Sequence, residues 1–228
     1  AIARYPAAFV HSGQPMAVSI TQATEAGTVY SPDEIRAIAE VAHAHGLPLH
    51  MDGARFANAL AHLGVDAAAM TWQAGVDLLS FGGTKNGCWM AEALVCLDPA
   101  LAAPAPFVRK RAAQLFSKSR FIAAQFEAYF RDGLWLEMAR HANAMAGALA
   151  GHIADSPRMR LAWQPQANEV FAAMPRDVMS GLQEKGVRFY EWPVPHFLEG
   201  GLAQGEVLTR LVTSFATTQD EVSRFAAL

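Results

Sequence analysis

Short apolar runs alternate with segments of helical periodicity along the first part of the chain. Ser31 is a predicted N-cap, Pro32 fills the first helical position, Glu34 completes a capping box, and Gly46 ends the helix. A brief second helix is predicted over 67–75. The apolar runs predict buried strands at residues 16–20, 47–51, 77–81 and 92–97. Strands and helices that alternate at this spacing are typical of an α/β fold with a mostly parallel sheet.

The second part of the chain has a different pattern. Residues 106–154 show helical periodicity almost throughout, with a predicted turn at Asp132 and Gly133. Beyond Pro157 come a helix over 176–185, a final helix capped by Thr218, and four strand candidates, RLAW, NEVFAAM, VRFYEW and LTRLVTS. We therefore predict two domains: residues 1–130 form part of a large domain with a long connecting helix, and residues 131–228 form a small C-terminal α+β domain.

Composition narrows the classes of protein that fit. With 228 residues, 52% of them hydrophobic, the chain has ample material for a core, and a net charge of −3 gives no reason to expect nucleic acid or an anionic membrane as partner. No run reaches the roughly 18 apolar residues of a membrane-spanning helix. Cys88 and Cys96 are the only cysteines, and nothing near them has metal-ligand spacing, so we expect reduced thiols, no metal site and a cytoplasmic location. Because the sequence lacks an initiator methionine, we expect it to be a piece of a longer chain.

The stretch DLLSFGGTKNG carries the first sign of chemistry. An apolar strand ends at Phe81 and opens into two glycines that precede Lys85. A phosphate-binding P-loop is excluded because Thr84 precedes the lysine and Asn86 follows it, and the dinucleotide motif GxGxxG is missing as well. The remaining chemical interpretation is a lysine that forms a Schiff base with a carbonyl. The alternative is a surface lysine on a glycine turn.

Asp52 strengthens the chemical interpretation because it ends the strand before the one that leads to Lys85. Ligands of open parallel sheets gather beyond the carboxyl ends of the strands. Pyridoxal phosphate needs a lysine for its aldehyde, an anion at its pyridinium nitrogen and donors for its phosphate. A carboxylate about 4 Å from that nitrogen is worth on the order of 4 kcal/mol at an effective dielectric of about 20. The alternative is that Asp52 is only a helix N-cap.

Two motifs together are specific enough to suggest a family. HMDGARFANAL (50–60) and SFGGTKNG (80–87) resemble the L-threonine aldolases, which are fold-type-I pyridoxal-phosphate enzymes. Supporting similarity is found in TQATEAGTVYSPDEI, MAEALVCLDP, KRAAQLFSKSRFIAAQ and LTRLVTSFATT. The resemblance implies a fold-type-I transferase-like architecture, in which the large domain binds the cofactor, and a homo-oligomer, dimer or tetramer, with shared active sites. Family members carry a further N-terminal stretch, so their phosphate-binding turn and ring-stacking residue have no counterpart here.

The same resemblance assigns roles to individual residues. It implies that Lys85 forms the Schiff base with the cofactor and that Asp52 is the partner of the pyridinium nitrogen. It also implies that Arg55 and Arg210 bind the carboxylate of the substrate, a task that suits planar guanidinium groups.

Further residues are candidates with plain alternatives. His11 is close to the position of a family histidine that acts near the substrate hydroxyl, but an ordinary loop histidine is an equal alternative. Gln22, Thr24 and Thr84 are candidate cofactor contacts, and a solvated turn is as reasonable for the first two. Lys118 resembles a basic residue that reaches a phosphate across a subunit interface, although an exposed helix face explains it as well.

The function that the resemblance implies is retro-aldol cleavage of L-threonine, L-allo-threonine or related L-3-hydroxy-α-amino acids to glycine and an aldehyde. One alternative is another fold-type-I enzyme, an aminotransferase or β-eliminating lyase, that shares Asp52 and Lys85 but breaks another bond. A second alternative is a catalytically incomplete fragment. The expected partners are a small amino-acid substrate and further copies of the chain.

Overall fold

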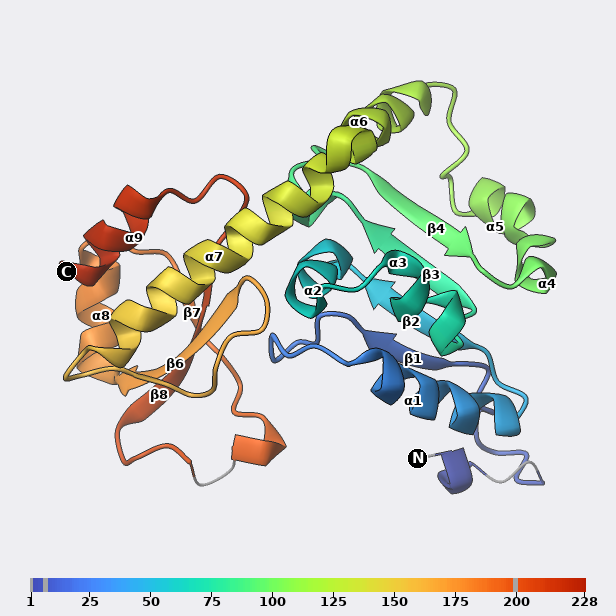
Figure 1. Ribbon diagram of the computed structural model, residues 1–228. Helices are drawn as coiled ribbons and strands as arrows, with labels where there is room; N and C mark the ends of the chain where they lie inside the picture. Colours follow the sequence, from blue (N-terminus) through green and yellow to red (C-terminus); the bar gives the residue numbers. More distant parts are fainter. Residues whose placement is uncertain (1, 6–7, 199–200) are drawn as a thin grey trace.

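Two β-sheets joined by one long helix organise the chain in the computed structural model, which describes residues 2–5, 8–198 and 201–228. The long helix is α7 (Leu134–Ala154), which runs diagonally between the two sheets in Figure 1. The N-terminal sheet lies beside the first turns of α7, and the C-terminal sheet lies beside its later turns (Figure 1).

The N-terminal sheet has the strand order β1-β2-β3-β4. Its members are β1 (Val18–Thr21), β2 (Leu49–Gly53), β3 (Leu78–Gly82) and β4 (Glu92–Cys96). The first three strands are parallel, and β4 is antiparallel to β3. The predicted α/β class with a mostly parallel sheet is therefore confirmed. The carboxyl ends of β1, β2 and β3 point toward the C-terminal sheet (Figure 1).

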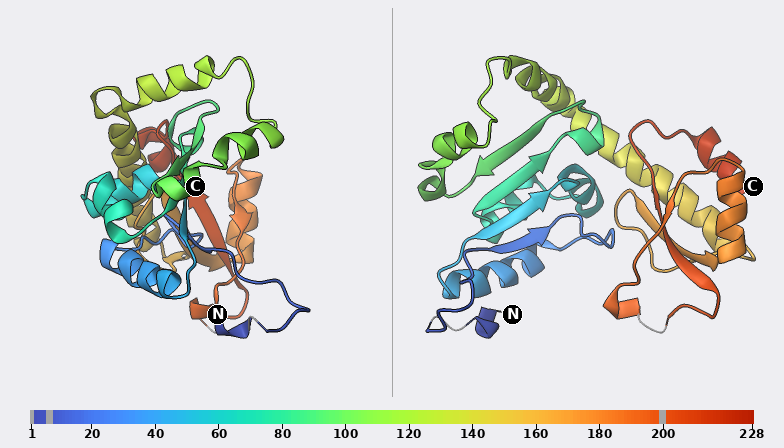
Figure 2. Two further views of the ribbon diagram at one scale, coloured as in Figure 1. Left: turned by 90° about the vertical axis from the view of Figure 1, so that its right-hand side faces the viewer. Right: turned by 180° about the vertical axis from the view of Figure 1, so that it is seen from behind.

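Helices cover one face of this sheet, and the opposite face is seen uncovered in the right-hand view of Figure 2. The covering elements are α1 (Pro32–Ala44), α2 (Phe56–Leu63), α3 (Ala67–Met70) and a 3₁₀ turn at Trp72–Ala74. The capping box predicted at Ser31 and Glu34 is present. Helix α2 was not predicted, although Gly64, which ends it in the left-handed conformation with φ 66°, is a usable C-cap signal.

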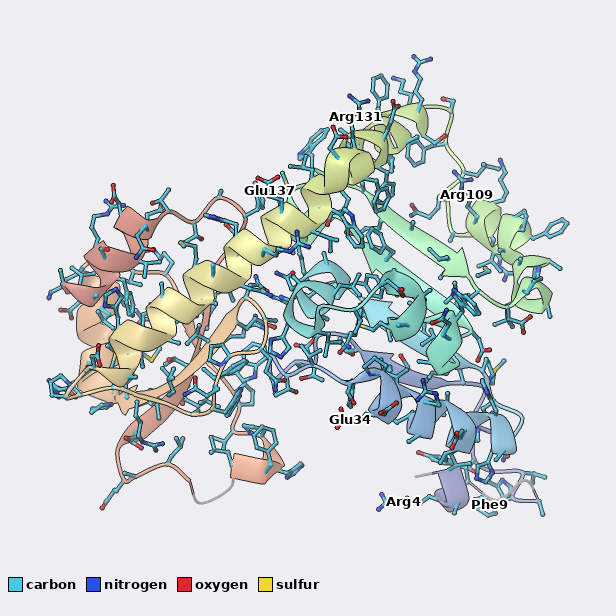
Figure 3. The ribbon with its side chains drawn as sticks, viewed as in Figure 1. Arg4, Phe9, Glu34, Arg109, Arg131 and Glu137 are labelled. Atoms are coloured by element: carbon cyan, nitrogen blue, oxygen red, sulfur yellow. The ribbon has the colours of Figure 1, made fainter. Side chains whose placement is uncertain are left out.

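The helical segment predicted over 106–154 is correct in part. It contains α5 (Ala105–Arg111), α6 (Arg120–Phe130) and α7, preceded by α4 (Pro99–Ala102). The segment between α5 and α6 is not helical, and Ala113 there has a positive φ of 58°. The predicted turn is confirmed because Asp132 (φ 54°) and Gly133 (φ 76°) separate α6 from α7. Figure 3 shows Arg131 at this bend and Arg109 on α5, both away from the C-terminal sheet.

The C-terminal sheet is antiparallel and has the order β5-β6-β8-β7. Its members are β5 (Arg160–Leu161), β6 (Glu169–Pro175), β7 (Tyr190–Glu191) and β8 (Glu206–Val212), accompanied by α8 (Arg176–Glu184) and α9 (Gln219–Ala226). Short 3₁₀ turns occur at Ile2–Arg4 and His196–Leu198. All four strand candidates and both helices of the predicted α+β unit are present. The edge strands β5 and β7 are shorter than their apolar patterns indicated.

Each sheet has its own hydrophobic cluster, and α7 contributes to both. Trp135, Leu136 and Met138 pack against the cluster of the N-terminal sheet, whereas Ala146 and Leu149 belong to the cluster of the C-terminal sheet. The domain boundary near residue 130 stays a prediction because α7 is shared. Within the described ranges, no helix has the length and apolar character needed to cross a membrane.

Phe81, at the end of β3, provides a test of the first cluster. Its ring lies within 5.5–6.4 Å of the ring centroids of Phe56, Phe126, Tyr129, Phe130 and Trp135. Phe81→Ala is expected to lower the free energy of unfolding by about 3–5 kcal/mol, because a buried ring is replaced by a cavity. Urea denaturation measures this loss. Val41→Ala, on the exposed side of α1, is the control, and equal losses in the two variants would contradict this account of the core.

Candidate active site

The two sequence motifs lie in direct contact at the carboxyl edge of the N-terminal sheet. A Cβ atom added to Gly82 would lie 2.8 Å from the Cα of Ala54, and one added to Gly53 would lie 2.9 Å from the carbonyl oxygen of Ser80. Both distances are shorter than any side chain tolerates, so glycine at these positions permits the close approach. The DGAR loop and the GGTK loop are therefore packed backbone against backbone.

Asp52 is the last residue but one of β2, and it lies between Thr21 of β1 and Ser80 of β3. Its side chain is half-buried, and Oδ1 accepts a hydrogen bond from the backbone N–H of Ala54 at 3.0 Å. The N-cap position of the following helix is occupied by Arg55, so the N-cap interpretation of Asp52 is wrong. The carboxylate is held by its own loop at the sheet edge where a ligand of this fold class is expected.

Lys85 lies on a 3₁₀ turn at Thr84–Asn86, directly after β3. The next residue, Asn86, is buried, and its side-chain amide donates hydrogen bonds to the hydroxyl of Tyr129 at 2.6 Å and to the carbonyl of Trp135 at 2.8 Å. These bonds fix the backbone of the turn, while the side chain of Lys85 is exposed and has no ion pair within the described ranges. An amine on a rigid turn without a competing carboxylate is available to a ligand.

Arg55 and Arg210 converge on one buried carboxylate, although they come from different sheets. An Nη atom of each guanidinium lies 3.2 Å from Oε1 of Glu169, the first residue of β6. Arg55 also donates through Nε to Oδ1 of Asn168 at 3.1 Å. The side chain of Glu169 is fully buried, whereas those of Arg55 and Arg210 are 12% and 25% exposed. The structure thus brings together the two arginines that the sequence predicted for a substrate carboxylate.

Burial and ion pairing shift the pKa values of this cluster in opposite directions. Burial raises the pKa of Glu169, and the two guanidiniums oppose that rise. Burial also lowers the pKa of Arg55, against the attraction of Glu169. At 3.2 Å each attraction is on the order of 5 kcal/mol at an effective dielectric of about 20, before the cost of desolvation, which is of similar size. The positive charge of Lys85 also opposes the rise of the Glu169 pKa.

The turn between β1 and α1 joins the cluster from the N-terminal sheet. Glu25 lies 3.9 Å from Arg210 but is 72% exposed, so its charge is largely screened. Gly27 has φ 66°, which favours glycine, and an added Cβ would lie in tight contact with Cβ of Glu169 at 3.2 Å and with the Phe171 ring at 3.1 Å. The indole N–H of Trp163 donates to the carbonyl of Ala26 at 2.9 Å. This turn therefore packs on β6 beside the arginines.

Gln22 and Thr24, predicted as cofactor contacts, have partners inside this turn. The amide of the fully buried Gln22 donates to the carbonyl of Tyr30 at 2.8 Å and accepts from the N–H of Tyr30 at 3.0 Å. The hydroxyl of Thr24 lies 2.7 Å from that of Thr28 and accepts from the N–H of Ala26 at 3.2 Å. These contacts engage both functional atoms of Gln22, so its side chain shapes the turn. The cofactor contacts of Gln22 and Thr24 stay predictions.

His11, Thr84 and Lys118 are placed differently from the four central residues. His11 packs edge-on against Phe9, which Figure 3 labels in the N-terminal segment near the far end of α1. The structure does not bring His11 to Asp52 or Lys85. Thr84 is exposed beside Lys85, and its N–H donates to Glu92 at 3.3 Å. Lys118 is exposed in the segment between α5 and α6, outside this cluster.

Sequence reasoning missed Asn86, Asn168 and Glu169. The first two are ordinary polar residues beside strands, and only the fold shows that their amides are buried. Glu169 had a signal, because an acidic residue opens the apolar run EVFAAM. A carboxylate is rarely buried at a strand start unless cations meet it.

The residues present fit pyridoxal phosphate in two respects. The exposed Lys85 supplies an amine, and the half-buried Asp52 supplies a carboxylate at a neighbouring strand end. The arginine pair supplies a separate cationic site that suits the carboxylate of a substrate. Among the described residues, no group of three or more His, Cys, Asp or Glu side chains is arranged to hold a metal ion. The arrangement suits Schiff-base chemistry on a ligand with a carboxylate.

Comparison with known proteins supports this description. The family model of the beta-eliminating lyases matches residues 1–176. The low specificity L-threonine aldolase of Pseudomonas sp. (strain NCIMB 10558) is 43% identical over 218 residues, which is 96% of this chain and 60% of that protein. The protein of the same name from Pseudomonas aeruginosa is 46% identical over 181 residues, which is 79% of this chain and 52% of that protein. The chain thus spans between half and two thirds of the length of these relatives.

Solved structures give the same result for the fold. The threonine aldolase of Leishmania major superposes with a TM-score of 0.86 and 30% identity, covering 99% of this chain and 63% of that one. Tryptophan decarboxylase of Catharanthus roseus superposes with a TM-score of 0.63 and 18% identity, covering 91% of this chain and 47% of that one. The second likeness shows the fold alone.

Tyr129 accepts a hydrogen bond from Asn86 and so helps to hold the turn that carries Lys85. Its buried hydroxyl predicts how the stability of the protein depends on pH. Burial raises the pKa of its hydroxyl from 10.0 to about 12, while the hydrogen bond from Asn86 opposes the rise. The phenol thus keeps its proton in the folded chain after the unfolded chain has lost it. The free energy of unfolding should fall as pH rises from 10 to about 12, by up to about 1.4 kcal/mol per pH unit.

Urea denaturation below and above pH 10 measures this dependence. Tyr129→Phe is expected to lose less stability than the wild type on the same rise in pH. Tyr190→Phe, at an exposed position, is expected to behave as the wild type does. A pH dependence that is unchanged in Tyr129→Phe would show that the buried phenol is not its source.

Proposed function

The chain belongs to the beta-eliminating lyase family, and from this premise we propose that it catalyses retro-aldol cleavage of L-threonine, L-allo-threonine or related L-3-hydroxy-α-amino acids to glycine and an aldehyde. The family uses pyridoxal 5′-phosphate. The observation that carries the proposal is the backbone contact of Gly82 with Ala54, which joins the loops that bear Lys85, Asp52 and Arg55. The names of the Pseudomonas and Leishmania relatives support the choice of reaction.

Lys85 and Asp52 would hold the cofactor between two neighbouring strand ends. When bound, pyridoxal phosphate supplies an electron sink for the bond that breaks at the α-carbon. The amine of Lys85 would hold the cofactor through its aldehyde group, and once released it would be placed to hold and return a proton at the α-carbon of the substrate. The carboxylate of Asp52 would favour the protonated form of the cofactor's ring nitrogen, because an adjacent anion favours the charged form.

Arg55 and Arg210 determine which bond is aligned for cleavage. Two guanidiniums that bind one carboxylate fix both its position and its plane. With the α-carboxylate held in this way, the protein fixes the orientation of the bond between the α- and β-carbons, which rotates freely in the unbound substrate. The β-hydroxyl proton must also be removed, and we assign this task to none of the described residues, because His11 lies elsewhere.

Elimination is the second candidate reaction, and the name of the matching family favours it. A β-eliminating lyase would share Lys85 and Asp52 but would release ammonia and a keto acid. An aminotransferase would instead pass the amino group to a second keto acid. Analysis of products from L-threonine separates the three, since only retro-aldol cleavage yields glycine and acetaldehyde in equal amounts.

The proposal also covers the oligomeric state, the cellular location and the activity of this chain by itself. We propose a homo-oligomer in the cytoplasm, in which Lys118 contacts the cofactor phosphate of a neighbouring copy. Exposed aromatic side chains on α5 and α6, Phe107 and Phe121, support an interface on that side of the molecule. Cleavage by this chain without further sequence is also a proposal, because it spans 60% and 52% of its curated relatives.

Lys85→Ala tests the central assignment. The wild-type protein incubated with pyridoxal 5′-phosphate is expected to show the visible absorbance of a lysine-bound cofactor and to release glycine from L-threonine. The variant is expected to lose the absorbance and to cleave ~10²–10⁴-fold more slowly, the range of positioned proton transfer. Lys110→Ala, which removes an exposed lysine of α5, is the control. A wild-type protein that stays colourless with the cofactor and releases no glycine would refute the proposed function.

Asp52→Asn tests the pyridinium partner, because asparagine keeps the shape and the hydrogen bond to Ala54 but removes the charge. Cofactor binding is expected to persist, so the visible absorbance remains. The cleavage rate is expected to fall ~10²-fold or more, because the ring nitrogen loses the anion that keeps it protonated. Absorbance spectra and glycine release measure the two effects separately. An unchanged cleavage rate would remove Asp52 from the mechanism.

A further inference from the structure

Glu169 is the residue on which both predicted carboxylate-binding arginines meet. Oε1 lies 3.2 Å from an Nη atom of Arg55 and 3.2 Å from an Nη atom of Arg210. Oε2 is buried as well and has no hydrogen-bond partner within the described ranges. One oxygen thus bridges an arginine of the N-terminal sheet and an arginine of the C-terminal sheet.

The formal charge of this cluster is a single positive charge. Two guanidiniums contribute +2 and the Glu169 carboxylate contributes −1. Glu25 adds little, because it is 3.9 Å from Arg210 and mostly exposed to solvent. Lys85 is exposed to solvent and forms no ion pair with Glu169 within the described ranges. The indole of Trp192, which lies 3.7 Å below the Arg210 guanidinium, is uncharged.

Aromatic side chains surround the cluster and reduce the screening of its net charge. Trp192 covers one side of Arg210, and the ring of Phe171, two residues beyond Glu169 on β6, lies 6.2 Å from the Trp192 ring. Phe171 is buried and stacks on Trp163 at 4.7 Å. Aromatic side chains lower the local dielectric, so an excess or deficit of one charge is screened less than at the surface.

We propose that Glu169 is a positioning and specificity-determining residue of the carboxylate site: it draws Arg55 and Arg210 onto one point and reduces their combined charge to one, so that the site accepts a ligand with a single carboxylate and disfavours a second anionic group. This inference rests on the proposed function for the identity of the ligand as an α-amino acid. It deepens that function by naming the substrate class, amino acids whose β-substituent is uncharged.

A purely structural role for Glu169 makes a different prediction. As a bridge between the sheets, the residue would affect the stability of the protein and the affinity for all anions alike. The ratio between the affinities of a dianion and a monoanion would not change. Charge matching instead predicts a change in this ratio, because only the dianion carries the extra charge that Glu169 opposes.

The experiment compares propionate with malonate, which has the same number of carbon atoms and one more carboxylate. Both are titrated at low ionic strength into the purified protein saturated with pyridoxal 5′-phosphate, and dissociation constants are obtained by ligand-observed NMR. Wild-type protein is expected to bind malonate no more tightly than propionate. In Glu169→Gln, which keeps the side-chain shape, the ratio is expected to shift toward malonate by about 10-fold.

Two further variants separate charge from shape. Glu169→Asp retains the charge, so it is expected to keep the wild-type ratio even where both affinities fall. Glu206→Gln removes a carboxylate that pairs with Arg160 at 2.7 Å at the other end of β8, and it is expected to leave the ratio unchanged. An unchanged ratio in Glu169→Gln would overturn the inference. If that variant does not fold, wild-type protein that binds malonate ten times more tightly than propionate would overturn it as well.

The outcomes remain separate from those of the proposed function. A shifted ratio in Glu169→Gln, together with a wild-type protein that releases no glycine from L-threonine, would support charge matching and refute the aldol reaction. Glycine release with an unshifted ratio would support the reaction and refute the part assigned to Glu169.

Discussion

The close approach of Gly82 to the backbone of Ala54 is the contact on which the rest of the site depends. Lys85 and Asp52 are 33 positions apart in the chain, and they share one edge of the sheet because β2 and β3 are parallel neighbours. Parallel pairing alone would leave the two loops free to diverge. Glycine at 53 and 82 removes the side chains that would separate them, so the amine and the carboxylate are held on adjoining turns.

The C-terminal sheet supplies the remaining residues of the candidate site. Asn168 and Glu169, at the start of β6, orient Arg55 from the opposite side, and Arg210 reaches the same carboxylate from β8. The turn at Ala26 and Gly27 packs on this strand and closes the junction. The proposed amino-acid site therefore lies between the two sheets, where residues far apart in the chain are brought together by tertiary structure.

Local sequence signals predicted the parts of this arrangement that depend on local physics. The capping box at Ser31 and the strands that lead to Asp52 and Lys85 are set by neighbouring residues, and the structure has them. The sequence marked Glu169 only as an acidic residue at the start of an apolar run, because its role depends on Arg55 and Arg210, and Arg210 is 41 positions away. The helical period over 112–119 was misleading because periodicity does not report the positive φ of Ala113. His11 was assigned by sequence register, but the segment before β1 approaches the sheet from its amino end.

Helix α7 is the feature with the widest mechanical consequence. Its first turns complete the aromatic cluster around Phe81, and its later turns fill the interior beneath β6 and β8. Without α7, both hydrophobic clusters would be exposed to solvent on one side. Unfolding of one sheet together with α7 would therefore expose the apolar side chains of the other sheet. This shared helix couples the two sheets into one cooperative unit, so the junction between them does not open independently.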